Sequence, residues 1–129
     1  MPASVAMVAL AMATLPTDVV GNGMARISKS FAVAEQAMGK VEDGTGKTSQ
    51  AAVVLGRLLG ESRNAATQIS SALVDQRTSS EAVRLVEWNG TFEAYLSASI
   101  LGLDGDESSL TLSRILGARL RREIDRRSK

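Results

Sequence analysis

The chain of 129 residues contains no cysteine and no histidine. The absence of cysteine excludes disulfides, thiolate metal sites and a cysteine nucleophile. The absence of histidine removes the most common general base and the most common metal ligand. No carboxylate is paired in sequence with a nucleophile, so we expect a protein that is not an enzyme and that uses no cofactor or metal.

Aromatic residues are also scarce. Only Phe31, Trp88, Phe92 and Tyr95 are present, although hydrophobic residues make up 44% of the chain. The core must therefore be built mainly from Ala, Leu, Val, Met and Ile, a composition that suits close helix packing better than strands. No useful stretch of strand-like alternation occurs. These features predict a single all-α domain over residues 1–129, a helical bundle with a long hairpin and a basic amphipathic C-terminal helix.

The only prolines are Pro2 and Pro16. Proline disrupts a helix interior, so Pro16 predicts that an apolar N-terminal helix over residues 1–16 ends near Leu15, before a loop at 20–23. The apolar run at 3–15 is shorter than the roughly 20 residues that span a bilayer, and no Lys or Arg precedes it. We therefore expect no transmembrane segment, no Sec-type signal and a cytoplasmic location, with signal-independent export left open.

Residues 24–88 carry apolar side chains at alternating spacings of three and four, which is typical of the seam of a coiled coil. A glycine-rich turn at 43–46 divides them and favours a helical hairpin, with one long helix as the alternative. Four seam positions are candidate interaction residues: Leu55, Leu59, Ile69 and Leu73. The full seam reads Met24, Ile27, Phe31, Ala34, Met38, Val41, then Ala52, Leu55, Leu59, Ser62, Ala66, Ile69, Leu73, Gln76, Ser80, Val83.

Residues 91–129 are predicted to form a pair of helices with a basic end. Asn89-Gly90 is a turn signal, a helix is expected to close at Gly102, and the acidic loop at 104–108 should start the last helix. The expected apolar stripe of that helix comprises Leu112, Ile115, Leu116, Leu120 and Ile124.

Charge is concentrated at the C-terminal end. From Arg114 onward there are seven basic and two acidic residues, a net of +5 in a chain whose total is +1. Such a cluster could bind a nucleic acid or an anionic surface, or could simply complement the helix dipole and keep the chain soluble. The candidate anion-binding residues are Arg119, Arg121, Arg122, Arg126 and Arg127.

Residues 69–83 resemble part of the cytoplasmic coiled-coil hairpin of bacterial chemoreceptors, which is rich in Ala, Ser and Gln and has the same heptad spacing. The hairpin tip by which that family contacts its kinase has no counterpart here. The resemblance therefore implies only a helix that packs in a bundle through small residues. In composition alone, the chain is also similar to subunits of secreted bacterial filaments.

The leading hypothesis is a non-enzymatic helical interaction or assembly protein that self-associates or binds a protein partner. The alternative is a nucleic-acid-binding accessory protein that uses the C-terminal arginines. A second alternative is a small component or chaperone of a bacterial secretion or filament apparatus, docking through residues 3–15.

Overall fold

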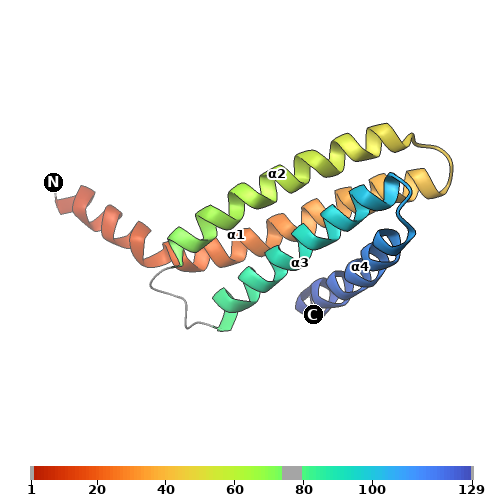
Figure 1. Ribbon diagram of the computed structural model, residues 1–129. Coiled ribbons are helices and arrows are strands. Elements are labelled where there is room, and N and C mark those ends of the chain that lie inside the picture. The colour runs from red at the N-terminus through yellow and green to blue at the C-terminus, as the bar shows by residue number, and fades with distance from the viewer. Residues whose placement is uncertain (1, 74–79, 129) are drawn as a thin grey trace.

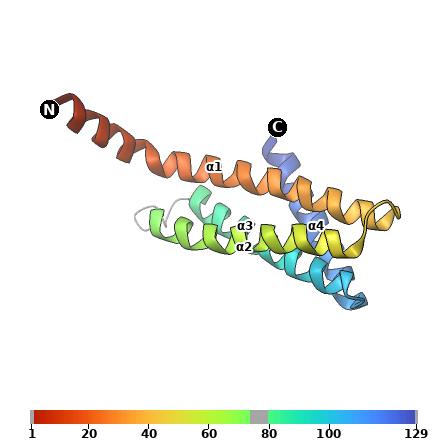
Figure 2. The same ribbon diagram turned by 90° about the horizontal axis from the view of Figure 1, so that it is seen from above.

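The computed structural model describes residues 2–73 and 80–128, with side chains described for 19–71, 73 and 80–127. The described residues form four helices and no strand: α1 (Pro2–Glu42), α2 (Thr48–Ala72), α3 (Ser80–Leu103) and α4 (Glu107–Ser128). Helices α1, α2 and α3 pack against one another, and α4 packs along α3 (Figures 1 and 2). The all-α bundle expected from the sequence is confirmed.

Helix α1 runs without a break through Pro16 and the glycines at 21 and 23, so the predicted helix end near Leu15 and the loop at 20–23 are wrong. A glycine costs a helix about 1 kcal/mol and a proline about 3 kcal/mol. Val20, Met24 and Ile27 are buried and share one side of α1, and this packing outweighs the poor local propensity. The N-terminal turns of α1 bend and extend past the ends of α2 and α3 (Figures 1 and 2).

A turn separates α1 from α2 where the glycine pair predicted one, but the hairpin does not extend over 24–88, because α2 ends at Ala72 and α3 begins at Ser80. At the turn, Gly44 takes a positive φ of 81°, and the backbone N–H of Gly46 donates to the Lys40 carbonyl over 2.8 Å. The Asp43 carboxylate accepts from the Thr45 N–H (2.9 Å) and from the Thr45 hydroxyl (2.6 Å). The alternative of one helix over 24–88 is wrong because α1, α2 and α3 are separate elements. The predicted seam position Gln76 lies outside the described residues.

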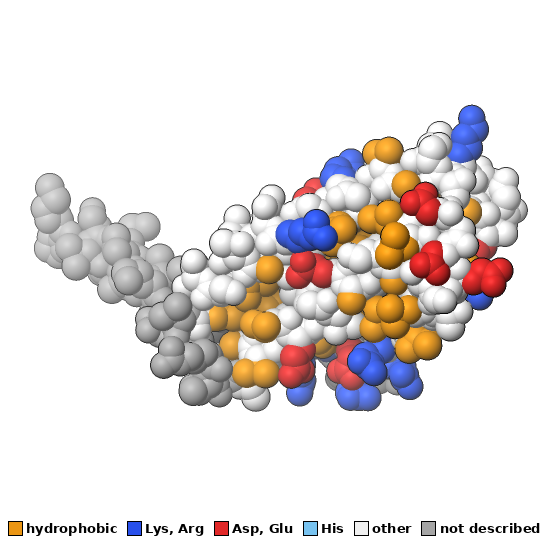
Figure 3. All heavy atoms as spheres, viewed as in Figure 1, with side chains coloured by type: hydrophobic (Ala, Val, Ile, Leu, Met, Phe, Trp, Pro, Cys, Tyr) orange, Lys and Arg blue, Asp and Glu red, His pale blue; other side chains and the backbone are white. Residues whose placement is uncertain are grey.

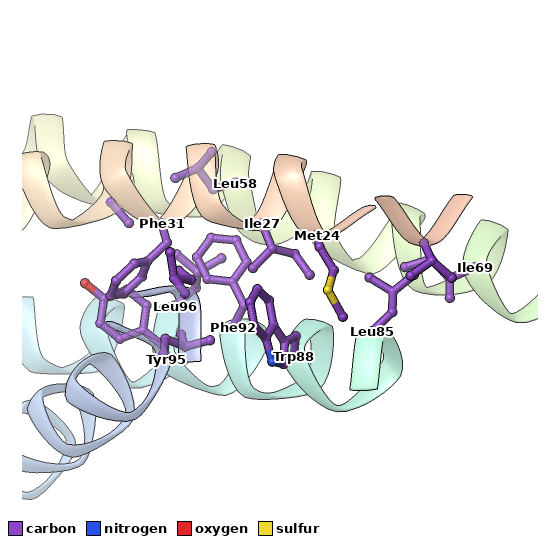
Figure 4. Packing of buried hydrophobic residues seen from close by; sticks show 14 of the residues in the cluster. Met24, Ile27, Phe31, Leu58, Ile69, Leu85, Trp88, Phe92, Tyr95 and Leu96 are labelled. Carbon is purple, nitrogen blue, oxygen red and sulfur yellow. The ribbon is translucent and has the colours of Figure 1, made fainter. Parts of the chain in front are cut away.

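The core lies mainly between the first three helices, with Leu120 and Ile124 of α4 joining it, and Figure 4 shows Phe31, Phe92 and Tyr95 close together within it. Phe31 of α1 meets Phe92 and Tyr95 of α3 edge-on, at ring-centroid distances of 6.5 and 5.2 Å. The seam predicted for α1 is buried from Met24 to Ala34. Of the seam predicted for residues 52–73, Leu55, Ser62, Ile69 and Leu73 are buried, whereas Ala51 and Leu58 take the buried places expected for Ala52 and Leu59.

The predicted turn at Asn89-Gly90 is also wrong, since both residues lie inside α3. The Asn89 side chain is buried and joins three helices. Its Oδ1 accepts from Arg26 of α1 at 2.7 Å and from the Ser62 hydroxyl of α2 at 3.3 Å, while its Nδ2 donates to the Ser62 carbonyl at 3.2 Å. These partners satisfy the amide within the bundle, so its usual preference for turns has no influence here.

The turn between α3 and α4 matches the prediction. Gly105 has a φ of 104°, and Asp106 caps α4 by accepting from the backbone N–H of Ser108 (3.1 Å) and of Ser109 (3.3 Å).

Small residues bring α4 close to α3. The hydroxyls of Ser99 and Ser113 are 2.7 Å apart, and a Cβ at Gly117 would lie 3.1 Å from Cε1 of Tyr95. The buried side of α4 is therefore Ser113, Gly117, Leu120 and Ile124. Of the five residues of the predicted stripe, Leu116, Leu120 and Ile124 pack inward, whereas Leu112 and Ile115 face outward.

Candidate interaction surface

The candidate interaction residues of α2 are placed inside the chain. Leu55, Ile69 and Leu73 are buried in the core, and Leu59 is half-buried against it. The helix contacts expected at these positions are made between α2 and its neighbours in the same chain. These four residues are therefore not free to bind a second chain.

Arg121 of α4 makes its contacts within the chain. Its guanidinium pairs with Glu35 of α1 and lies 3.7 Å from Asp125 one turn further along α4. The same guanidinium lies 5.1 Å from the ring centroid of Phe31, a cation–π distance. Arg121 thus links α4 to α1 across the edge of the aromatic core.

The other C-terminal arginines divide into two groups. Arg126 pairs with Glu123 at 3.2 Å, and Arg127 lies 4.0 Å from Glu81 of α3. The exposed Arg119 and Arg122 form no ion pair with any described residue. An anionic ligand would therefore find two unpaired arginines here, where the sequence suggested five.

Large aliphatic side chains are exposed on the outer sides of α3 and α4. Hydrophobic side chains gather in patches over these helices on the face shown in Figure 3. On α4, Leu112 is 47% exposed and Ile115 is 56% exposed. The exposed set on the two helices comprises Val83, Val86, Leu101, Leu112 and Ile115. Their side chains project away from the core, so folding of the single chain leaves them in water.

The sequence placed Val83 on the seam of residues 52–83 and placed Leu112 and Ile115 on one stripe of the last helix, but it did not separate exposed positions from buried ones. The signal that could have corrected this for α4 is the pair of small residues Ser113 and Gly117, four positions apart beside the stripe. Small residues at that spacing mark the side on which two helices approach closely.

Two grooves flank α4. The groove between α1 and α4 has a volume of about 330 Å³, and its lining includes Glu35, Met38, Tyr95 and Arg121. The groove between α3 and α4 has a volume of about 450 Å³ and is lined by Arg84, Glu87, Trp88, Thr91, Arg119, Leu120 and Glu123. Both grooves are lined by charged and apolar side chains together.

Tyr95 lines the first groove, and its hydroxyl has a shifted pKa. Burial, together with the negative charge of Glu35, raises the pKa of the Tyr95 hydroxyl to about 12. The phenol is therefore neutral throughout the physiological range and serves as a packing residue of the α1–α3–α4 junction.

Raising the pH from 10 to 12 should destabilise the protein through Tyr95 by about 2 kcal/mol. An unfolded tyrosine ionises near pH 10, whereas the folded protein keeps its proton up to about pH 12, so the unfolded state binds fewer protons in this window. Urea unfolding at several pH values measures the slope. Tyr95→Phe is the control, since it should remove most of this pH dependence. An equal slope in both proteins would contradict the assignment.

Among the described residues, no group of three or more Asp and Glu side chains is placed to hold a metal ion. The helices of the described part contain no stretch that is long and apolar enough to cross a membrane. No protein-family model, no curated protein and no solved structure matches the chain.

Proposed function

We propose that this protein is a non-enzymatic helical interaction protein that assembles with further copies of itself through the outer side of α3 and α4. One observation carries the proposal: five large aliphatic residues on these two helices are between 45% and 56% exposed. Exposed apolar patches on a soluble protein commonly mark interaction sites.

The pattern on α3 supports a helical partner. Val83, Val86 and Leu101 share one exposed side of the helix with Gly90, Ala94 and Ser97, which lie between them. Small residues flanked by larger aliphatic ones allow another helix to approach closely. Helix α3 thus has two apolar sides. One is buried toward α1 and α2, and the other is exposed. A helix that is apolar on more than one side is typical of the interior of a larger assembly.

Light scattering over a range of concentrations tests this proposal. We expect the average mass of the wild-type chain to rise with concentration above that of a monomer. The double variant Leu101→Lys/Ile115→Lys should have a dissociation constant at least about tenfold higher, because association would bury unpaired charges.

The matched control is Val53→Lys, at a position on α2 that is 73% exposed and lies outside the proposed surface. This variant should associate like the wild type, and circular dichroism should show the same helix content in all three proteins. A wild-type chain that stays monomeric at every concentration would refute the proposal.

A further inference from the structure

We infer that α4 pairs with α4 of a second copy in an antiparallel, two-fold arrangement whose axis passes near Ile115. This inference rests on the proposed function and gives it a geometry. The exposed side of α4 carries one line of residues with spacings of four and three: Ser108, Leu112, Ile115, Arg119, Arg122 and Arg126. This spacing is that of a coiled-coil seam. The line lies opposite the side that packs on α3, so a second helix can reach it without disturbing the fold.

Charge is distributed along α4 in a way that selects the antiparallel direction. Acidic residues precede and open the helix at Asp104, Asp106 and Glu107, the exposed aliphatic residues follow, and arginines occupy the last part of the line. Parallel pairing would place the arginines of two copies side by side, which is repulsive. Antiparallel pairing places them beside the acidic end of the other copy.

The charged groups at the two ends are available for such contacts. Asp104 and Glu107 are exposed and form no ion pair with any described residue, and the same holds for Arg119 and Arg122. Asp106 caps its own helix and adds negative charge at the same end. Each copy thus offers unpaired acids at one end of α4 and unpaired arginines toward the other.

The spacing about Ile115 fixes the register. Ser108 and Arg122 lie seven residues before and after Ile115, which corresponds to about 10 Å along a helix on either side. A two-fold axis at Ile115 therefore brings Arg122 opposite the partner's Ser108. It also brings Leu112 against the aliphatic stem of the partner's Arg119, a contact that such stems commonly make.

The predicted contact is small. Helix α4 has 22 residues, so the paired length is about 33 Å, and a single helix pair buries less than the roughly 1,200 Å² of a stable specific interface. We therefore expect a weak dimer that dissociates on dilution and that weakens as salt screens the charged ends.

Cross-linking tests the axis directly, because the natural chain contains no cysteine. The Ile115→Cys variant should form a disulfide-linked dimer on mild oxidation, since residues at a two-fold axis come within the Cα separation that a disulfide requires. Position 53 is more exposed than position 115 but lies on α2, so the Val53→Cys variant should remain largely monomeric under the same conditions.

Substitution of Ser108 tests the register and direction. Ser108→Glu should lower the dissociation constant about three- to tenfold by adding two symmetry-related ion pairs with the partner's Arg122, and Ser108→Lys should raise it by a similar factor. Thermal melting of both variants at a concentration where the chain is monomeric separates this effect from any change in α4 itself.

The outcomes distinguish this inference from the proposed function. If the wild type associates but Ile115→Cys does not cross-link and the two Ser108 variants behave alike, the α4 pairing is overturned while self-association stands. If the wild type is monomeric, both fail. Salt-sensitive binding of a short DNA duplex by a monomeric chain, lost in Arg119→Ala/Arg122→Ala, would also overturn the pairing and assign these arginines to an anionic ligand.

Discussion

We expect the Phe31→Ala variant to lose about 3–5 kcal/mol of unfolding free energy, which lowers the melting temperature by roughly 10–20 °C. Phe31 is fully buried and contacts the rings of Phe92 and Tyr95, while the guanidinium of Arg121 lies over its face. The substitution therefore opens a cavity where α1 meets α3 and also removes the aromatic contact that supports α4.

Urea unfolding followed by circular dichroism measures this loss. Val33→Ala is the matched control, because Val33 lies on the same helix and is more than one-third exposed. It should change the unfolding free energy by less than about 1 kcal/mol. A loss below that value for Phe31→Ala would show that the aromatic contacts are not the centre of the core.

The Asn89→Ala variant should be destabilised by about 2–4 kcal/mol. It removes the acceptor of Arg26 and of the buried Ser62 hydroxyl, and a buried polar group left unpaired costs about 1–3 kcal/mol. The Ser62 carbonyl loses a second bond but keeps its place in the backbone ladder of α2. Burial already lowers the pKa of Arg26, with Glu61 acting in the opposite direction. The half-buried guanidinium therefore loses a hydrogen-bond acceptor when the substitution deletes the amide.

A double-mutant cycle shows whether these groups act as a network. Combining Asn89→Ala with Ser62→Ala should cost at least about 1 kcal/mol less than the sum of the single variants. Thr91→Ala is the control on α3, because the Thr91 hydroxyl donates to the Glu87 carbonyl of its own helix and bonds no other helix among the described residues. Strict additivity of Asn89 and Ser62 would contradict the three-helix network.

The class of fold and the hairpin between α1 and α2 could be predicted from the sequence because they depend on local signals. The spacing of Met24, Ile27 and Phe31 and the glycine turn at 43–46 act over a few residues. The errors occur where a distant contact overrides such a signal. Asn89 is a turn former in isolation, yet partners on α1 and α2 hold it inside α3.

The placement of the interaction surface was less predictable, for a related reason. Apolar periodicity identifies a side of a helix that leaves water, but it does not say whether the covering helix belongs to the same chain. On α4 two apolar lines lie side by side, and Leu120 and Ile124 face α3 while Leu112 and Ile115 do not. The close approach of Gly117 to Tyr95 determines which of the two lines is buried. Because Tyr95 lies on another helix, the sequence of α4 alone does not reveal this contact.

The order in which the helices are synthesised affects how the aromatic core assembles in the cell. Phe92, which covers Phe31, follows it by 61 positions in the sequence. At a translation rate of about 5–20 residues per second, the buried side of α1 is made about 3–12 s before its main cover exists. During this interval the residues of α1 lack the packing that stabilises the helix, and their apolar side chains remain uncovered. The nascent chain is therefore most exposed to chaperones and to aggregation through its first helix.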